Sequence, residues 1–359
     1  MQACQAMATH DIVLIGASAG GVEAISAIVA GFPRDLRAAI LVVLHVSRGR
    51  SVLPEILTRA GRLPALHPND GERIQYGRIY VAPPDHHMTL EGDVVRVTHG
   101  PSENGVRPAV DPLFRSAARA FGSRVVAIVA TGSLDDGTAG MAAVKEAGGI
   151  AIVQDPGEAF APSMPRSVMS AVSVDHVLPI GEIAPMVVAL VREEAPAGGG
   201  RGGPHVVAME PDRGPEQLAL TGPDRPGAVS VFTCPECSGT LWESEESNIL
   251  RFRCRVGHVY TQESMLAAQV DSVDRALWTA LRALEERAAL SRKLAERARA
   301  RQHRWVANAF ERRASATEDQ AALVKRVLLD RSEAHVLPDQ NVDGPLEEVE
   351  LKTAQSQSD

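Results

Sequence analysis

A serine between glycines near the start of the chain is the first residue that could act as a nucleophile. Ser18 follows the apolar run Ile12–Ile15 and precedes Gly20 and Gly21, after which apolar residues recur at helical spacing from Val22. A short β-branched run followed by a helical pattern predicts a tight turn from a buried strand into a helix. Such a turn exposes the serine at the carboxyl end of the strand, facing helix amides that favour developing negative charge.

Three interpretations of this turn are open on the segment alone. A dinucleotide-binding fingerprint would need a second glycine where Ser18 stands, because the backbone must approach a pyrophosphate there. A glycine-rich turn with a capping serine is common and carries no chemistry. The third interpretation is a serine nucleophile, because G-A-S-A-G also fits the G-x-S-x-G pattern.

A serine nucleophile needs an adjacent base, usually a histidine. His45 directly follows the apolar run Ala39–Leu44, so we expect it at the end of the strand next to that of Ser18. His86 and His87 also end a strand-like segment and are reserve candidates. A lone histidine at a strand end is also common as a structural residue.

The base in turn needs a carboxylate that holds its tautomer and stabilises its charged form. Asp135 and Asp136 end the segment V-V-A-I-V-A-T-G-S-L-D-D-G, a buried strand followed by a glycine-punctuated loop. Because carboxyl ends of parallel strands meet at one edge of a sheet, we expect the two acids on the same edge as Ser18. Asp-Gly is also a turn signal, so one aspartate can cap a helix while the other faces the site.

A second kind of chemistry is indicated by three of the chain's four cysteines. Cys234, Cys237, Cys254 and His258 have the spacing C-x2-C-x16-C-x3-H, which places paired soft ligands on two turns. Four such ligands make a tetrahedral zinc site with no open position, so we predict structural zinc in a ribbon or knuckle. A disulfide framework is the alternative, but it would leave the histidine without a role.

The elements that must position these residues alternate along the first half of the chain. Strand-like runs alternate with helical stretches, which predicts an α/β fold: a doubly wound, mostly parallel sheet with helices on both faces. The expected strands after Ile12–Ile15 are Ala39–Leu44, Arg78–Ala82, Val125–Ala130 and Ile150–Val153, and the expected helices are Val22–Ala30, Val52–Arg59, Pro112–Phe121 and Gly140–Ala147.

Composition changes sharply along the chain and predicts five segments. They are a catalytic α/β domain (1–192), a flexible linker rich in glycine and proline (193–229), a zinc-ribbon unit (230–262), a helical hairpin or coiled-coil segment (263–336) and a disordered tail (337–359). The helical segment has apolar residues at intervals of three and four, the spacing of a buried seam. The expected seam residues are Leu266, Val270, Val273, Leu277, Ala280 or Leu281, Leu284, Trp305, Phe310, Leu323, Val327 and Leu328. This segment could bury its own seam, form a homodimer or dock a regulatory partner.

The chain's composition narrows the class of protein. A net charge of −8 argues against a nucleic-acid binder, although Arg251, Arg253 and Arg255 could make a small basic face. No apolar stretch approaches membrane-spanning length and the N-terminus lacks a signal-peptide pattern, so we expect a cytoplasmic protein without a membrane span.

Seven ordered segments resemble chemotaxis receptor methylesterases of the CheB type over about Ile12–Leu190. They are I-G-A-S-A-G-G, L-V-V-L-H-V, D-G-E-R-I, I-Y-V-A-P-P-D-H-H-M, R-P-A-V-D-P-L-F, T-G-S-L-D-D-G-T-A-G-M and S-M-P-R-S-V. The resemblance implies Ser18 as nucleophile, His45 as base and Asp136 as the orienting acid, with no catalytic cofactor. It also implies hydrolysis of glutamate γ-methyl esters on the cytoplasmic helices of chemoreceptors, commonly with deamidation of receptor glutamines.

The sequence departs from that family in several places. The usual enzyme has an N-terminal receiver domain, whereas the first expected strand here begins near residue 12, so we expect none and no control by phosphorylation in cis. Ala19 stands where the family often has threonine, and Ser133 and Leu134 stand where it often has methionine and glycine. A catalytically weak or inactive adaptor that binds receptors or signalling partners through its zinc and helical segments is the alternative function.

The C-terminal region also resembles an extension found on some relatives. The matching segments are F-R-C-R-V-G-H and A-L-W-T-A-L-R-A-L-E-E-R. The extension could replace the receiver as a regulatory or docking module, or it could assemble the enzyme into dimers.

Overall fold

The computed structural model describes residues 9–46, 49–195 and 227–334. Within these ranges the chain divides into two compact units at the boundary between Gln269 and Val270. The Cys/His segment therefore belongs to the same unit as the α/β sheet. Most of the expected linker and all of the expected tail (337–359) lie outside the described residues.

Seven parallel strands form the central sheet, in the order β3-β4-β2-β1-β7-β8-β9. Their bounds are β1 Ile12–Ala17, β2 Ala39–Leu44, β3 Ala65–Leu66, β4 Arg78–Val81, β7 Val125–Val129, β8 Ile150–Gln154 and β9 His176–Leu178. Every residue of β1, β2 and β7 is buried, which is why these segments are almost continuously apolar. The strand order reverses direction between β1 and β7, and open α/β sheets build their sites at such a switch point.

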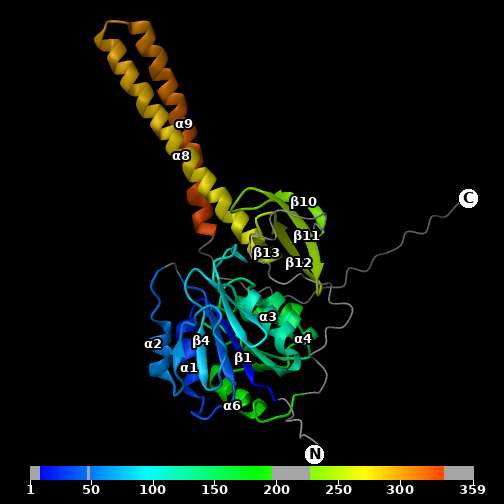
Figure 1. Ribbon diagram of the computed structural model, residues 1–359. Coiled ribbons are helices and arrows are strands. Elements are labelled where there is room, and N and C mark those ends of the chain that lie inside the picture. Colours follow the sequence, from blue (N-terminus) through cyan, green and yellow to red (C-terminus); the bar gives the residue numbers. More distant parts are fainter. Residues whose placement is uncertain (1–8, 47–48, 196–226, 335–359) are drawn as a thin grey trace, which may run out of the picture. The chain divides into compact units, whose positions relative to one another are not determined.

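Helices cover both faces of this sheet, as the alternation predicts. Alternate residues of β1 belong to different cores: Ile12 and Leu14 face one, and Val13 and Ile15 face the other. The helices are α1 Gly21–Ala30, α2 Leu53–Ala60, α3 Val110–Phe121, α4 Thr138–Glu146, α5 Ser163–Ala171 and α6 Ile180–Leu190, and η1 Gly122–Arg124 is a short 3-10 turn. The first core contains residues of α3, α4 and α5, and the second contains residues of α1, α2 and α6 (Figure 1). The doubly wound architecture is therefore confirmed.

A two-stranded antiparallel sheet was not foreseen in the sequence. It consists of β5 His87–Glu91 and β6 Val94–Thr98 and precedes α3. Met88, Leu90 and Val95 are buried in the first core, so the hairpin extends the apolar layer around α3.

The Cys/His segment forms a four-stranded antiparallel sheet, here called the Cys/His sheet. Its strands are β10 Ala228–Thr233, β11 Thr240–Glu246, β12 Ile249–Cys254 and β13 Val259–Thr261. Leu241, Phe252 and Tyr260 form its small core. The suggested basic face is wrong at Arg251, whose side chain is only 2% exposed because it pairs with two glutamates.

The C-terminal helices pack as a hairpin, α8 Gln262–Ala300 and α9 Arg304–Ala334. Leu281 and Leu328 lie in its core as expected, with Leu277 and Leu284 packed against it, but alanines supply most of the remaining seam. The buried alanines are Ala288, Ala295, Ala298, Ala307, Ala314 and Ala321. Small residues allow two helices to approach closely, which is why the larger apolar residues lie elsewhere.

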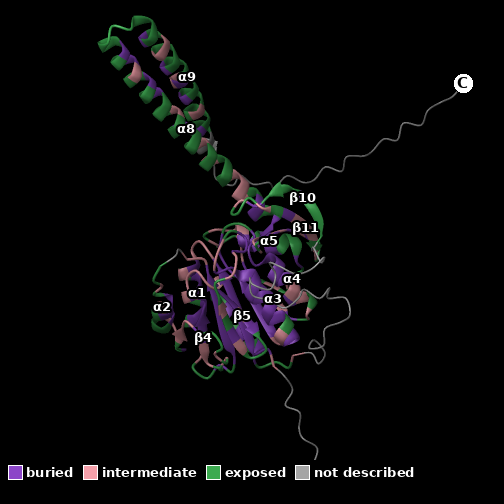
Figure 2. Cartoon of the chain, turned by 45° about the horizontal axis from the view of Figure 1, so that its top comes forward, coloured by how far each residue is buried: buried purple, intermediate pink, exposed green. Residues whose placement is uncertain are grey.

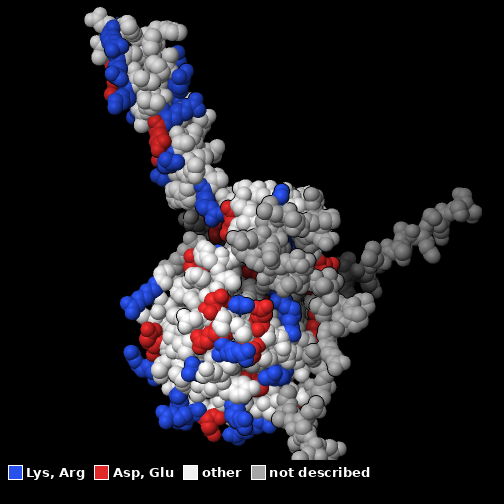
Figure 3. Space-filling view, in the orientation of Figure 1, with Lys and Arg blue, Asp and Glu red and all other residues white. Residues whose placement is uncertain are grey.

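Several expected seam residues are consequently exposed, and these assignments were wrong. They are Leu266, Val273, Trp305, Leu323 and Val327. Most residues of the hairpin are exposed (Figure 2). Acidic and basic side chains are both distributed along the face of the hairpin seen in Figure 3. In the part of the chain that is described, no helix combines the length and apolarity needed to cross a bilayer.

Candidate active site

Ser18 lies where β1 ends and α1 begins, as its glycine-rich turn predicts. Its amide donates to the carbonyl of Thr131 at 2.9 Å, which fixes the turn between the carboxyl ends of β1 and β7. Gly20 has a φ of 74°, which favours glycine. A Cβ on Gly21 would lie 2.8 Å from the Cβ of Ala17, so the helix can start this close to β1 only with glycine there.

His45 and Asp136 meet in a direct hydrogen bond. Nε2 of His45 donates to Oδ2 of Asp136 over 2.7 Å, although the two residues are 91 positions apart in the chain. Asp136 comes from the loop after β7, and His45 comes directly after β2. The two strand ends that the sequence singled out are therefore brought together at one edge of the sheet.

Ser18 and His45 lie side by side, each directly after the last residue of one of two adjacent strands. Ala17 pairs with Leu44, and the amide of His45 donates to the carbonyl of Ala17 at 3.2 Å. Among the described residues no hydrogen bond joins Ser18 Oγ to the imidazole; such contacts are often loose without substrate and tighten in the complex. Since Nε2 is engaged by Asp136, Nδ1 is the ring nitrogen left to accept a proton.

Asp136 is held by four hydrogen bonds and is only 2% exposed. Besides His45, the backbone amides of Val110 (2.7 Å) and Asp111 (3.2 Å) and the side-chain amide of Asn104 (3.0 Å) donate to its carboxylate. The two backbone donors open helix α3. Burial raises the pKa of Asp136, but the hydrogen bonds from His45, Val110 and Asn104 outweigh it and hold the pKa below the ordinary value. The group is therefore an anion placed against an imidazole.

The side chains of Ser18 and Met164 leave little space around Gly132. A Cβ on Gly132 would lie 3.0 Å from Ser18 Cβ and still closer to Met164, so only glycine fits. The amides of Ala19 and Gly20 donate to no acceptor within the described part of the chain. They lie at the N-terminal end of α1, where partial positive charge favours an anion.

The reserve histidines lie elsewhere in the fold. Nδ1 of His87 accepts from the amide of Ala109, and its Nε2 donates to the carbonyl of Pro101, so both ring nitrogens are engaged. Burial lowers the pKa of His87, which keeps this buried ring neutral. His86 Nδ1 bonds the carbonyl of Pro84, two residues away. Within the described part of the chain, neither histidine is hydrogen-bonded to Asp136.

Asp135, the other acid of the pair, faces a different neighbour. It is 5% exposed and interacts with Thr261 of the Cys/His sheet rather than with His45. Burial raises its pKa from 3.8 to about 6. The pKa values of the two adjacent aspartates are thus shifted in opposite directions, and only Asp136 contacts the histidine.

Two residues beside Asp136 were missed in the sequence. Asn104 and Asp111 are buried, and one amide group of Asn104 donates to both Asp136 and Asp111 at 3.0 Å. Burial, together with the charge of Asp136, raises the pKa of Asp111 to about 7. The expected helix began at Pro112, one residue too late to mark Asp111 as a first-turn acid.

Leu134 has an unusual backbone. Its φ of 64° lies in the left-handed region, which favours glycine, and it stands where the resembling family often has glycine. Leu134 is 40% exposed. The sequence departure at this position therefore has a structural cost in the loop that carries Asp136.

The Cys/His cluster has the geometry of a four-ligand metal site. One donor atom from each of Cys234, Cys237, Cys254 and His258 lies within 4.8 Å of all the others. The Sγ atoms of Cys237 and Cys254 are 3.6 Å apart, close to the roughly 3.8 Å that a tetrahedral zinc with 2.3 Å bonds requires. His258 directs Nδ1 at the sulfurs of Cys234 and Cys254.

The other ring nitrogen of His258 supports the same assignment. Its Nε2 lies 3.3 Å from a carboxylate oxygen of Glu236. A carboxylate behind a ligating histidine fixes the ring's tautomer and orientation, as is usual at metal sites. The residues present therefore fit a metal with four protein ligands.

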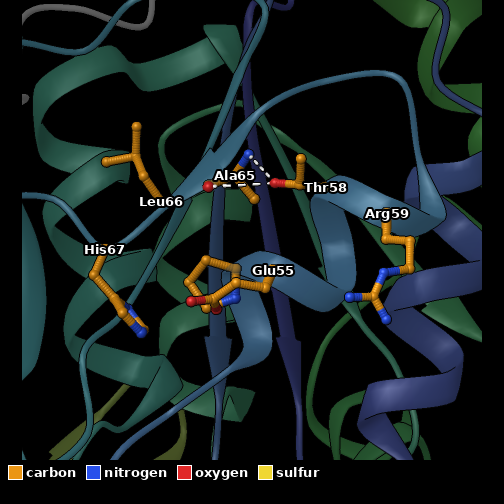
Figure 4. Close-up of a pocket in the computed structure, with 7 residues that line it drawn as sticks. Glu55, Thr58, Arg59, Ala65, Leu66 and His67 are labelled. Carbon is orange, nitrogen blue, oxygen red and sulfur yellow. Dashed lines mark hydrogen bonds between the residues drawn. The ribbon is translucent and has the colours of Figure 1, made fainter.

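A separate pocket of about 540 Å³ lies between α2 and the short strand β3 (Figure 4). Glu55, Arg59 and His67 are among its lining residues, and Thr58 is hydrogen-bonded to Ala65 at its wall. Ser18, His45 and Asp136 do not line it. This pocket is therefore separate from the candidate catalytic residues.

Comparison with known proteins identifies the family of the α/β part of the chain. Residues 13–187 match the family described as CheB methylesterase. Protein-glutamate methylesterase/protein-glutamine glutaminase 2 of Anaeromyxobacter dehalogenans is 37% identical over 174 residues, which are 48% of this chain and 51% of that protein. The Leptospira interrogans protein named "Putative protein-glutamate methylesterase/protein-glutamine glutaminase" is 34% identical over 183 residues, 50% of this chain and 95% of that protein.

The catalytic domain of Thermotoga maritima CheB methylesterase is a similar solved structure. It is 33% identical, with a TM-score of 0.49, and the match covers 50% of this chain and 98% of that chain. The chain spans about half the length of the Anaeromyxobacter relative and nearly all of the Leptospira one.

Proposed function

Because the chain belongs to the CheB methylesterase family, we propose that it is a serine hydrolase that removes methyl groups from glutamate γ-methyl esters. The proposed substrates are the methylated cytoplasmic helices of chemoreceptors, and receptor glutamines are proposed as second substrates. The observation that carries this proposal is the 2.7 Å hydrogen bond between His45 and Asp136 beside the Ser18 turn.

In the proposed reaction, Nδ1 of His45 takes the proton of Ser18 as Oγ attacks the ester carbonyl carbon. The negative charge of the tetrahedral intermediate faces the amides of Ala19 and Gly20; one such donor is typically worth about 3 kcal/mol. The bond from the carbonyl carbon to the methoxy oxygen then breaks, and the imidazolium returns its proton to release methanol. Asp136 stabilises the imidazolium throughout.

Water completes the cycle by attacking the acyl-enzyme. His45 takes a proton from the attacking water and returns it to Ser18 Oγ as the acyl bond breaks. The glutamic acid side chain that leaves then loses its remaining proton to solvent and becomes a carboxylate. For a glutamine substrate the same steps release ammonia in place of methanol. No step needs a catalytic cofactor.

Methanol release from membranes that contain methylated chemoreceptors tests this function. We expect the wild type to release methanol and Ser18→Ala to lose at least about a thousandfold in rate, because the residual site lacks a nucleophile. Ser26→Ala, the same change at a half-buried position within α1, is the matched control and should keep full activity. Equal release by the wild type and Ser18→Ala, or none by either, would refute the proposal.

We also propose that Cys234, Cys237, Cys254 and His258 hold a structural zinc ion. With four protein ligands the ion would have no open position, so it would fold and brace the Cys/His sheet without joining the reaction. Atomic emission should find one zinc per chain. Cys237→Ser should lose the metal, whereas Cys4→Ser, the same change at the chain's remaining cysteine, should keep it. Zinc absent from the wild type, or retained by Cys237→Ser, would count against the site.

A further inference from the structure

Asn104 joins the candidate catalytic acid to the Cys/His sheet. It is 7% exposed, and its Nδ2 donates to Oδ1 of Asp136 and to Oδ2 of Asp111, each at 3.0 Å. A side-chain amide has two N–H bonds, so these two carboxylates use its full donor capacity. Both N–H groups of the Asn104 side chain therefore donate to aspartates in the α/β part of the unit.

The side-chain oxygen of Asn104 accepts hydrogen bonds from residues at the junction between β13 and α8. Oδ1 accepts from the backbone amide of Thr261 at 3.1 Å and from the hydroxyl of Ser264 at 3.0 Å, with the Thr261 hydroxyl 3.3 Å away. All three residues are at least 90% buried. A backbone N–H can only donate, so the oxygen must face Thr261, and the nitrogen must then face Asp136. The junction therefore fixes which way round the amide lies.

The backbone around Asn104 is tied to the same segment. Its amide donates to the carbonyl of Val259 at 2.7 Å, and the amide of Val259 donates to Ser102 at 3.3 Å. The neighbouring Glu103 pairs with Arg115 of α3 at 2.7 Å and with Arg251 of β12 at 2.5 Å. Breaking a buried pair on one side leaves an uncompensated charge, so the Cys/His sheet is firmly held here.

We propose that Asn104 is a positioning residue for Asp136, and that Thr261 and Ser264 make the Cys/His sheet a working part of the hydrolase site. If the donors from the junction were lost, the oxygen of the amide would have no anchor, and the side chain could rotate away from the two carboxylates. Oδ1 of Asp136 would then keep only the 3.2 Å bond from Asp111. A carboxylate free to rotate would hold the imidazole of His45 less well. This inference rests on the proposed function.

A double-mutant cycle on methanol release from methylated receptor membranes tests the proposal. Asn104→Ala should lower kcat about tenfold or more, the effect of one hydrogen bond to a charged group, and change KM less than about twofold. Ser264→Ala should lower kcat severalfold in the same manner. Ser264 also bonds Thr261, but in the proposal it affects kcat through the Asn104 amide, so in the double variant kcat should equal that of Asn104→Ala alone.

Two further variants separate positioning from general destabilisation. Thr261→Val should lower kcat, and Thr261→Ser, which restores the hydroxyl, should recover it. Ser247→Ala removes a hydroxyl that bonds Glu146 of α4 from the turn before β12, and its kcat should be unchanged. A fully active Asn104→Ala, multiplicative losses in the double variant, or an equal loss in Ser247→Ala would overturn the proposal. Absence of methanol release by the wild type would instead refute the proposed function.

Discussion

Asp136 and Asp111 cap each other's helices. Asp136, which precedes α4, accepts the amides of Val110 and Asp111 at the start of α3. Asp111, in the first turn of α3, accepts the amides of Gly137 at 3.1 Å and Gly140 at 2.6 Å at the start of α4. Each carboxylate therefore satisfies amides that would otherwise lack partners, and the exchange locks the two helices together. The acid that orients His45 is built into the packing of the fold.

Replacing Asp136 by asparagine removes its charge but keeps the shape of the side chain, so it tests the catalytic role of the carboxylate. We expect Asp136→Asn to lower kcat by about 10⁴-fold, as in other serine–histidine–aspartate sites where the amide favours the wrong histidine tautomer. The measurement is methanol release at pH 7, with circular dichroism to show that the fold is retained. Asp93→Asn, the same change at an exposed acid paired with Arg73, should keep normal activity. Activity of Asp136→Asn within tenfold of the wild type would contradict the assignment.

Asp135 should make stability depend on pH in the opposite direction to an ordinary ion-paired acid. Its pKa is about 6 in the folded chain against 3.8 for a free side chain. The folded state therefore binds more protons than the unfolded state between about pH 4 and 6, and stability falls as pH rises through that window.

Asp135→Asn should remove this dependence. Above pH 6 the variant should be more stable than the wild type by about 3 kcal/mol, the equivalent of the pKa difference, and below pH 4 the difference should disappear. Urea unfolding at pH 4 and pH 8 measures both. A variant that is equally stabilised at the two pH values would show that packing rather than ionisation is responsible.

Leu134 should be more stable as glycine. A non-glycine residue in the left-handed region costs about 1 kcal/mol, so Leu134→Gly should raise the free energy of unfolding by roughly that amount. Met169 is 41% exposed, almost the same as Leu134, but lies within helix α5. Met169→Gly should therefore lose about 1 kcal/mol. The same sign of change in both variants, measured by urea unfolding, would rule out backbone strain at Leu134.

Local patterns were enough to find the residues at strand ends. Ser18 and His45 follow short apolar runs that predict buried parallel strands, and the position at the carboxyl end follows from chain direction. Asp136 was located in the same way, but only the family resemblance, and not the residue pattern, distinguished it from Asp135. The difference between them arises from their neighbours: His45 contacts one, and Thr261 interacts with the other.

Asn104 could not have been found by such patterns. Its partner Thr261 lies 157 residues further along the chain, and neither residue belongs to a recognisable motif. The hairpin seam was misjudged for a different reason. Large apolar residues were taken as the buried set, whereas closely packed helices leave room mainly for alanine and place residues such as Trp305 at the surface.

The alanine seam of the hairpin should reject larger side chains. Ala314 is 2% exposed, and its replacement by leucine would force the two helices apart or strain the added methyl groups. Overpacking of this kind typically costs about 1–3 kcal/mol, so Ala314→Leu should lower the unfolding temperature of the hairpin. Ala316→Leu, two residues away on the exposed side of α9, is the matched control and should change stability by less than about 0.5 kcal/mol. Thermal unfolding followed by far-UV circular dichroism measures both, and equal stability of the two variants would mean that the seam does not hold the hairpin together.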